Sequence, residues 1–256
     1  MTHLFPETAQ FIHSLQKNEN VLGILLVGSK SQGHDDSDSD DDLEVVVTET
    51  LHNLVPRIEQ YHDPVTHKLR YDIRYTTLSA LKQKVVSPLD TEHWPYEHAS
   101  VLYDAQDGLI RDLCTAVAEM DASFRTLRIR YAAVSTTVAI GKACKALQRG
   151  YKTSSQLVVS RGAIMLARLL FALEWRWKPT DHWLEPELLT LKDPAQASLL
   201  LLEAVRSSSP YALREAMNRL ENTFLQEVPN REERAHLYGQ IMHFSHASQR
   251  EIHTLF

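Results

Sequence analysis

The stretch that decides the fold begins at Val21–Val27 (VLGILLV), continues into Gly28-Ser29, and resumes after a polar spacer at residues 39–43 (SDDDL). An unbroken apolar run of this kind is typical of a strand buried on both faces of a sheet. Residues 43–48 (LEVVVT) predict a second strand. The acidic spacer between the two strands predicts a loop.

The rest of the first half alternates short helical and strand patterns. Apolar residues at helical spacing predict a helix over residues 7–17. Residues 69–75 alternate polar and apolar side chains, which predicts a strand with one wetter face. The other elements predicted here are a helix over 51–60 interrupted by Pro56, a helix over 78–85 and a strand over 101–104.

Helical periodicity dominates the second half of the chain. The predicted helices cover residues 122–149, 154–175, 194–206, 211–226 and 232–255. Gly150 follows the first of them, as glycine commonly does at a helix end. We therefore expect an α/β domain over residues 1–110 and an all-α domain over residues 111–256.

Composition narrows the class of protein. Hydrophobic residues are 43% and charged residues 23% of the chain, which suits a globular protein with a sizeable core. The formal net charge of -6 gives no general attraction to nucleic acid or to an anionic membrane, so neither partner is expected. The two cysteines lack CxxC spacing. With no secretory pattern and no membrane-length apolar run, we expect a soluble cytoplasmic protein.

Gly28-Ser29 and the acids that follow predict a phosphate and metal site. Glycine lets the backbone turn sharply beside a phosphate, and a serine hydroxyl can bind phosphate oxygens. Asp40 and Asp42 lie two residues apart, so on a strand both side chains point to one face. Adjacent carboxylates repel each other and suit a divalent cation such as Mg²⁺. Asp72, within the predicted strand 69–75, is the best candidate for a third acid.

Taken together, residues 28–29 (Gly-Ser), residues 39–43 (Ser-Asp-Asp-Asp-Leu) and Asp72 resemble the nucleotidyltransferase superfamily, which includes DNA polymerase beta and the aminoglycoside adenylyltransferases. The family pattern is Gly-Ser, a spacer, Ser-Asp-x-Asp-Leu and a third acid on a later strand. The helical second half also looks like the antibiotic-modifying branch. The resemblance implies an α+β nucleotidyltransferase domain with a small mixed sheet, followed by a helical bundle.

The resemblance also implies an activity. The enzyme would transfer a nucleoside monophosphate, AMP from ATP, to a hydroxyl of a small-molecule acceptor and release pyrophosphate. Asp40 and Asp42 would hold Mg²⁺, and Asp72 would complete a second Mg²⁺ site or act as base on the acceptor. The residues that would contact the nucleotide are Gly28, Ser29, Lys30 and Ser39. Alternatively, Lys30 only offsets the charge of the acid run.

The sequence departs from the family pattern between the two acids. The intervening residue is usually apolar, and here it is Asp41, which we expect either at an exposed strand start or in a strained position. A shifted register would pair Asp42 with Glu44, so Glu44 is kept as a reserve metal ligand. Two alternatives stay open: the same fold acting on a protein or RNA end, and a non-catalytic nucleotide-binding regulator or antitoxin-like partner.

Two segments of the second half have two interpretations each. Residues 175–183 are rich in tryptophan and charge, which fits either an acceptor-stacking surface or an aromatic packing cluster. Lys142, Lys145 and Arg149 share one helical face and either meet the triphosphate or form a solvated surface.

Overall fold

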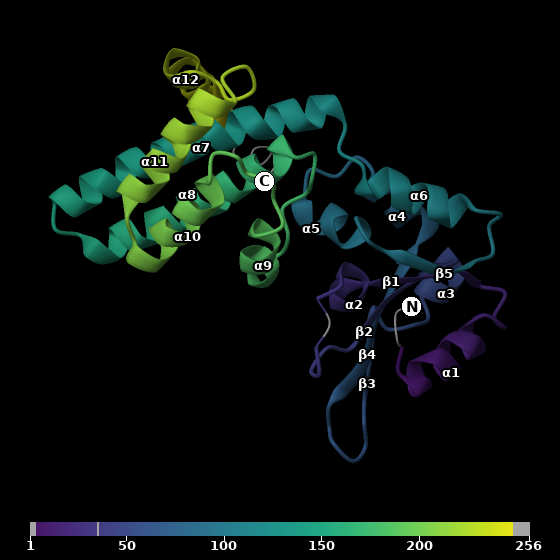
Figure 1. Cartoon of the computed structure of the whole chain (residues 1–256). Helices are drawn as coiled ribbons and strands as arrows, with labels where there is room; N and C mark the ends of the chain where they lie inside the picture. Colours follow the sequence, from purple (N-terminus) through teal and green to yellow (C-terminus); the bar gives the residue numbers. More distant parts are fainter. Residues whose placement is uncertain (1–3, 35, 248–256) are drawn as a thin grey trace. The chain divides into compact units, whose positions relative to one another are not determined.

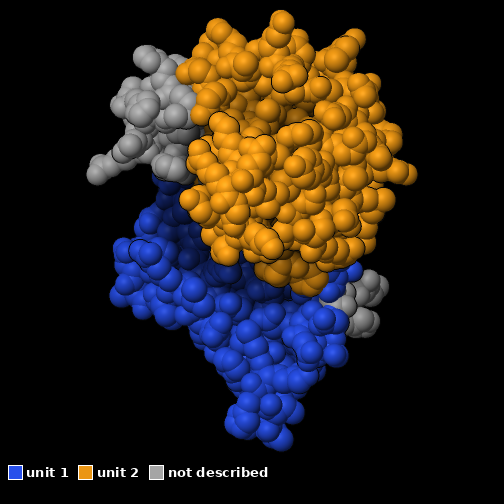
Figure 2. All heavy atoms as spheres, turned by 90° about the vertical axis from the view of Figure 1, so that its left-hand side faces the viewer, with its two compact units in different colours: residues 1–87, 91–119 blue, residues 88–90, 120–256 orange. Residues whose placement is uncertain are grey.

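The computed structural model describes residues 4–34 and 36–247, with the backbone alone for residues 241–247 (Figure 1). The chain divides into two compact units (Figure 2). Unit 1 comprises the described residues up to Ser87 together with Thr91–Glu119, and unit 2 comprises Pro88–Asp90 and the described residues from Met120 on. Unit 1 therefore extends past residue 110; the assignment of two separate domains stays a prediction.

Unit 1 is built on a small mixed sheet, as the sequence predicted. The five strands lie in the order β3-β4-β2-β1-β5. Strand β1 pairs antiparallel with β2 and β5, β2 pairs parallel with β4, and β3 pairs antiparallel with β4. The strands are β1 (Val21–Val27), β2 (Asp41–Val47), β3 (Ile58–His62), β4 (Leu69–Thr77) and β5 (Ser100–Asp104).

Helices cover both faces of this sheet. On one face, Ile12 of α1 packs against apolar side chains of β1, β2 and β4. On the other face, Leu81 of α4 and Ile110 of α6 pack against Leu25 and Val46. The helical elements in this part of the chain are α1 (Pro6–Leu15), α2 (Gly28–Gln32), α3 (Glu49–His52), α4 (Leu78–Lys84), α5 (Asp90–His93), η1 (Trp94–Tyr96) and α6 (Leu109–Ala118).

The structure of unit 1 differs from the local predictions in four places. The helix predicted over 51–60 is instead the short α3 followed by the edge strand β3, whose exposed and half-buried residues alternate. The short helix α2 extends to Gln32, into the spacer that was predicted as a loop, and helix α6 was not predicted. Strand β2 begins at Asp41, earlier than predicted, so Asp41 and Asp42 are strand residues.

Unit 2 is helical, which confirms the second part of the predicted fold class. The long helices α7 and α8 lie side by side and are joined by a short turn, and α10 and α11 pack beside them (Figure 1). The elements are α7 (Ala122–Gln148), α8 (Lys152–Leu173), η2 (Asp181–Trp183), α9 (Leu184–Leu188), α10 (Ala197–Ser207), α11 (Pro210–Thr223) and α12 (Arg231–Ala247). The predicted last helix continued to residue 255, and residues 248–255 lie outside the described part.

Helix α8 has an unusually apolar composition. Among the described residues it is the one helix long and apolar enough to cross a membrane by length and composition. Half of that stretch is buried inside the protein, as in the core helix of a helical bundle. This property is therefore weak evidence for a membrane span.

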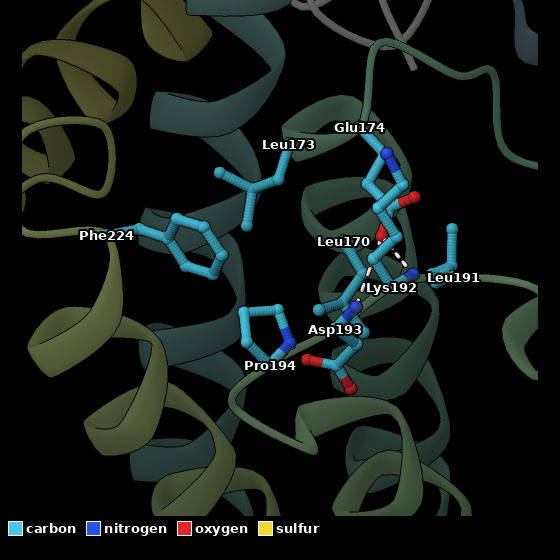
Figure 3. A pocket seen from close by; sticks show the side chains of 8 residues that line it. All are labelled: Leu170, Leu173, Glu174, Leu191, Lys192, Asp193, Pro194 and Phe224. Atoms are coloured by element: carbon cyan, nitrogen blue, oxygen red, sulfur yellow. Dashed lines mark hydrogen bonds between the residues drawn. The ribbon is translucent and has the colours of Figure 1, made fainter.

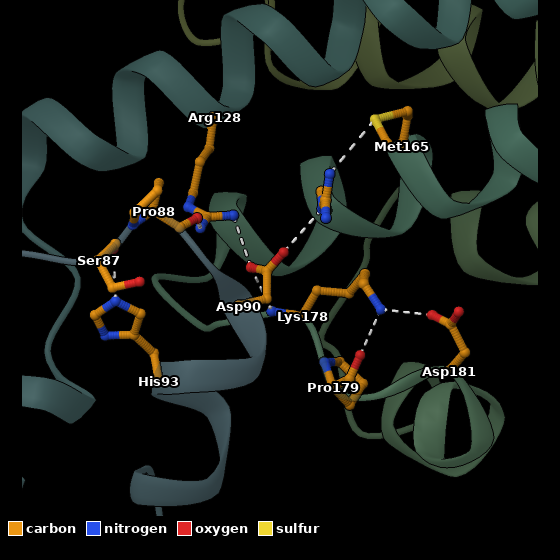
Figure 4. A network of polar contacts seen from close by, with 10 residues as sticks. Ser87, Pro88, Asp90, His93, Arg128, Met165, Lys178, Pro179 and Asp181 are labelled. Carbon is orange, nitrogen blue, oxygen red and sulfur yellow. Dashed lines mark hydrogen bonds and ion pairs between the residues drawn. The ribbon is translucent and has the colours of Figure 1, made fainter. Parts of the chain in front are cut away.

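A buried polar network organises the interior of unit 2 (Figure 4). The Asp90 carboxylate accepts hydrogen bonds from Arg128 at 2.6 Å and Arg168 at 2.8 Å. The Arg128 guanidinium also lies 4.5 Å from the centre of the Trp177 ring, and Trp177 is fully buried. Trp177 is thus a packing residue, which favours the packing interpretation for this part of residues 175–183.

Candidate active site

Three strands of unit 1 bring the predicted site residues together at one end of the sheet. In the antiparallel register, Val27 at the end of β1 lies opposite Asp42 near the start of β2. In the parallel register, Asp42 lies beside Asp72 of β4. Since β1 runs straight into Gly28, the predicted phosphate turn and two of the three predicted acids are neighbours.

Gly28 lies against the Asp42 carboxylate. A Cβ atom added at Gly28 would lie 1.9 Å from Asp42 Oδ2, far inside van der Waals contact. The backbone of Gly28 also has a positive φ of 75°, which side-chain-bearing residues rarely adopt. Only glycine therefore allows this approach of the β1–α2 turn to Asp42. The next residue, Ser29, is buried at the start of α2.

The acids strongly perturb one another. Burial, together with the negative charges of Asp40 and Asp72, raises the pKa of Asp42 to about 7, while Arg74 opposes the shift. Burial also raises the pKa of Asp40, and the charges of Asp72 and Asp41 add to it. A cation placed among these carboxylates would relieve both effects, because it favours their charged forms.

Asp72 keeps one oxygen available. Its Oδ1 atom is buried and has no hydrogen-bond partner among the residues that the structure describes. Its Oδ2 atom accepts a long hydrogen bond of 3.4 Å from Gln60 Nε2 on the edge strand β3. Gln60 was missed from the sequence because β3 was missed; the alternation of residues 58–62 was the available signal. An orphaned buried carboxylate oxygen is unusual and fits an absent ligand.

Asp42 and Asp72 fit a Mg²⁺ site in which the protein supplies only a few of the ligands. Within residues 4–34 and 36–240, no group of three His, Cys, Asp or Glu side chains is arranged to hold a metal ion by itself. Magnesium usually takes one or two carboxylates, and substrate phosphates and water complete its shell. Asp42 and Asp72 are positioned to supply such a pair, with Asp40 close enough to influence both.

Asp41 lies at the start of β2 but is not exposed, so the sequence interpretation of an exposed strand start was wrong. Its side chain is fully buried and forms a 2.7 Å ion pair with Lys30 Nζ. Its other oxygen accepts the Phe5 backbone N–H at 2.9 Å. Lys30 Nζ also lies 3.8 Å from the centre of the Phe5 ring. These contacts favour the charge-offsetting role that was the alternative for Lys30, with Asp41 as the acid that it neutralises.

Two further predicted residues have other partners. Both Glu44 oxygens accept from Lys84 Nζ at 2.8 and 3.0 Å, and Tyr96 donates to Glu44 Oε1 at 2.5 Å. This buried arrangement does not support Glu44 as a reserve metal ligand, so we leave it out of the candidate site. The Ser39 hydroxyl donates a hydrogen bond to the Asp36 carboxylate within the same loop. Its predicted contact with the nucleotide would require that hydrogen bond to break.

Unit 2 contains a pocket whose lining includes none of Asp40, Asp42 and Asp72 (Figure 3). It has a volume of about 310 Å³ and largely apolar walls that include Leu170, Leu173 and Phe224. Glu174 also lines the pocket, and its carboxylate accepts hydrogen bonds from the backbone N–H groups of Lys192 and Asp193. The site defined by Gly28, Asp42 and Asp72 belongs to unit 1 and is distinct from this pocket.

Comparison with known proteins gives limited information. No family model matches the sequence, and no curated protein matches it. Among solved structures, the chain is similar to a nucleotidyltransferase-like protein from Exiguobacterium sibiricum, with 16% identity and a TM-score of 0.48. The match covers 84% of this chain and 72% of that one. A likeness at this level assigns no function.

Proposed function

We propose that this protein is a magnesium-dependent nucleotidyltransferase that transfers AMP from ATP to a hydroxyl group of a small-molecule acceptor. The observation that carries the proposal is the junction of Gly28, Asp42 and Asp72. The glycine lies against one carboxylate and the second carboxylate lies beside it in register. The choice of ATP rests on the habit of the family that residues 28–29, residues 39–43 and Asp72 resemble, and the choice of a small acceptor rests on the likeness of the helical second half to the antibiotic-modifying branch.

Each residue has a chemical role in this proposal. The turn at Gly28 lets the backbone approach the triphosphate, and the Ser29 hydroxyl donates to a phosphate oxygen. Asp42, Asp72 and Asp40 would hold Mg²⁺, which supplies neutralisation of the triphosphate charge and of the leaving pyrophosphate. Asp72 Oδ1 is the candidate acceptor for the proton of the attacking hydroxyl.

The proposed transfer is a single displacement at the α-phosphorus of ATP. The acceptor oxygen forms a bond to the α-phosphorus, and the bond from that phosphorus to the bridging oxygen of the β-phosphate breaks. The hydroxyl proton leaves to a base, and pyrophosphate departs with the electron pair of the broken bond. In-line transfer of this kind depends mainly on positioning and on electrostatic stabilisation.

The first test is nucleotide binding by thermal unfolding, with each nucleoside triphosphate and with or without Mg²⁺. A ligand that binds only the native state raises the unfolding midpoint. At a ligand concentration of a hundred times the Kd, it stabilises the native state by about 2.7 kcal/mol. We expect a magnesium-dependent rise with ATP that Asp42→Asn and Asp72→Asn abolish. The matched control is Asp38→Asn, which removes an exposed carboxylate from the same acid run and should leave the rise intact.

Pyrophosphate release then separates enzyme from regulator. Release in the presence of a panel of hydroxyl-bearing acceptors, lost in Asp42→Asn, supports catalysis. Tight magnesium-dependent binding of ATP without release for any small molecule, RNA end or protein would favour a nucleotide-binding regulator. The absence of a midpoint shift with every nucleotide would overturn the proposal.

A further inference from the structure

The charged side chains of the helical hairpin α7–α8 in unit 2 are all positive. Between Ala122 and Leu173 the sequence contains no aspartate and no glutamate, although the whole chain has a net charge of -6. The cations in this range are Arg125, Arg128, Arg130, Lys142, Lys145, Arg149, Lys152, Arg161 and Arg168. Solvated helices usually carry charges of both signs, so a hairpin that carries only positive charges is a candidate binding surface for a negatively charged partner.

The cations nearest the start of α7 and the end of α8 have acidic partners in other elements of unit 2. Arg128 and Arg168 share Asp90, and Arg125 pairs with Glu227 at 2.5 Å. Arg130 lies 3.7 Å from Glu233. At that end of the hairpin, three carboxylates therefore offset most of the charge of four arginines.

The cations near the turn between the two helices have no such compensation. Lys142, Lys145, Arg149 and Lys152 are exposed, and no ion pair to any of them occurs among the described residues. We call these four residues the hairpin basic patch. Lys142 and Lys145 lie on one face of α7, and Arg149 follows at the C-cap of the helix, about 10 Å along the axis from Lys142.

Residues around the hairpin basic patch add to its character. Arg214 of α11 reaches the same part of α7, where its guanidinium lies 3.3 Å from Cys144 Sγ. The acid that follows it, Glu215, is paired with Arg219 at 2.9 Å. Tyr151 lies between Arg149 and Lys152 in the turn and is 61% exposed.

We propose that the hairpin basic patch binds the phosphate backbone of a single-stranded nucleic acid, with Tyr151 stacking on a base. Clustered lysine and arginine side chains bind phosphates by releasing condensed counterions. An exposed aromatic ring among them is the usual stacking platform for single strands. A membrane surface is less well matched, because interfacial binding uses a broad apolar face, whereas the four residues of the patch are charged and Tyr151 beside them carries a polar hydroxyl. The net charge of the whole chain conceals this local surface.

The test is fluorescence anisotropy of labelled single-stranded RNA and DNA of mixed sequence, without nucleotide or magnesium. The variant is Lys142→Glu/Lys145→Glu/Arg149→Glu, and Lys142→Gln/Lys145→Gln/Arg149→Gln provides a milder form. The matched control is Lys17→Glu/Lys82→Glu/Arg111→Glu, which makes the same change in net charge at exposed positions of unit 1. Circular dichroism confirms that each variant is folded.

We expect the Glu variant to bind at least about tenfold more weakly than the wild type, and the control by less than about twofold. In the Gln variant, the slope of log K against log salt should fall by about 2, since each phosphate contact on a single strand contributes about 0.7. Tyr151→Ala should weaken binding and leave the slope unchanged, because stacking is not ionic. These readouts do not involve the acids of unit 1, so they are independent of the proposed transferase activity.

Three outcomes would overturn this inference. The first is no binding of either nucleic acid at about 50 mM salt. The second is equal weakening by the patch and control variants, which would reflect net charge alone. The third is patch-dependent binding of vesicles that contain phosphatidylserine without binding of RNA or DNA, which would assign the surface to a membrane.

Discussion

The contribution of the buried Lys30–Asp41 ion pair to the stability of unit 1 can be measured directly. Lys30 belongs to α2, next to Ser29, and Asp41 begins β2, next to Asp42. Their side chains are 7% and 0% exposed, and their charged atoms are 2.7 Å apart. The pair therefore ties the phosphate turn to the acid strand.

Removal of one partner leaves the other as an uncompensated buried charge, which typically costs about 3–5 kcal/mol. We expect Lys30→Met and Asp41→Asn each to lower the free energy of unfolding by about this amount. The double variant removes both charges, so its loss should be smaller than the sum of the two single losses by about 2 kcal/mol or more. Urea denaturation measures the total, and hydrogen exchange of the β2 amides reports on unit 1.

The chain offers a control pair with nearly the same separation and opposite burial. Lys68 and Asp38 are 2.6 Å apart, and their side chains are 54% and 78% exposed. Lys68→Met should cost no more than about 1 kcal/mol, because solvent screens an exposed pair. If Lys30→Met were as mild as Lys68→Met, or if the losses in the buried pair were additive, the reasoning from burial would be refuted.

Three further predictions concern the same end of the sheet. Gly28→Ala should displace the Asp42 carboxylate and weaken magnesium-dependent ATP binding in calorimetry, whereas Gly33→Ala, with the same φ of 75° and open space around it, should leave that binding unchanged. Because the pKa of Asp42 rises from 3.8 to about 7 on folding, the ligand-free protein should lose stability as pH rises between those values, by at most about 4 kcal/mol, and urea titrations should show this loss reduced in Asp42→Asn. A profile as steep in Asp42→Asn as in the wild type would contradict that assignment. Glu44→Gln should lower the free energy of unfolding by on the order of 3 kcal/mol because it leaves the Lys84 ammonium without its carboxylate, yet magnesium-dependent ATP binding should persist; loss of that binding in a folded variant would return Glu44 to the site.

Local patterns were sufficient where one physical signal was dominant. The apolar run of β1 predicted its bounds as observed, and helical periodicity predicted the long helices α7 and α8. Strand β3 was missed because it is an edge strand with few apolar residues, so its identity depends on pairing with β4. Edge strands are stabilised by a neighbour's backbone, which the local sequence does not display.

By itself, the sequence determined the strands of the first half, the helices of the second half and the positions of Gly28, Asp42 and Asp72 as candidates, because periodicity and motif spacing are local properties, whereas the mixed sheet followed from the family resemblance. Only the tertiary structure decided which charges are paired. Asp41 is compensated by Lys30 and by the Phe5 backbone, and Glu44 by Lys84 and Tyr96, and none of these pairs is marked by the local sequence pattern. Burial and the distance between charges set the free energy of an ion pair, and both arise only when the chain has folded.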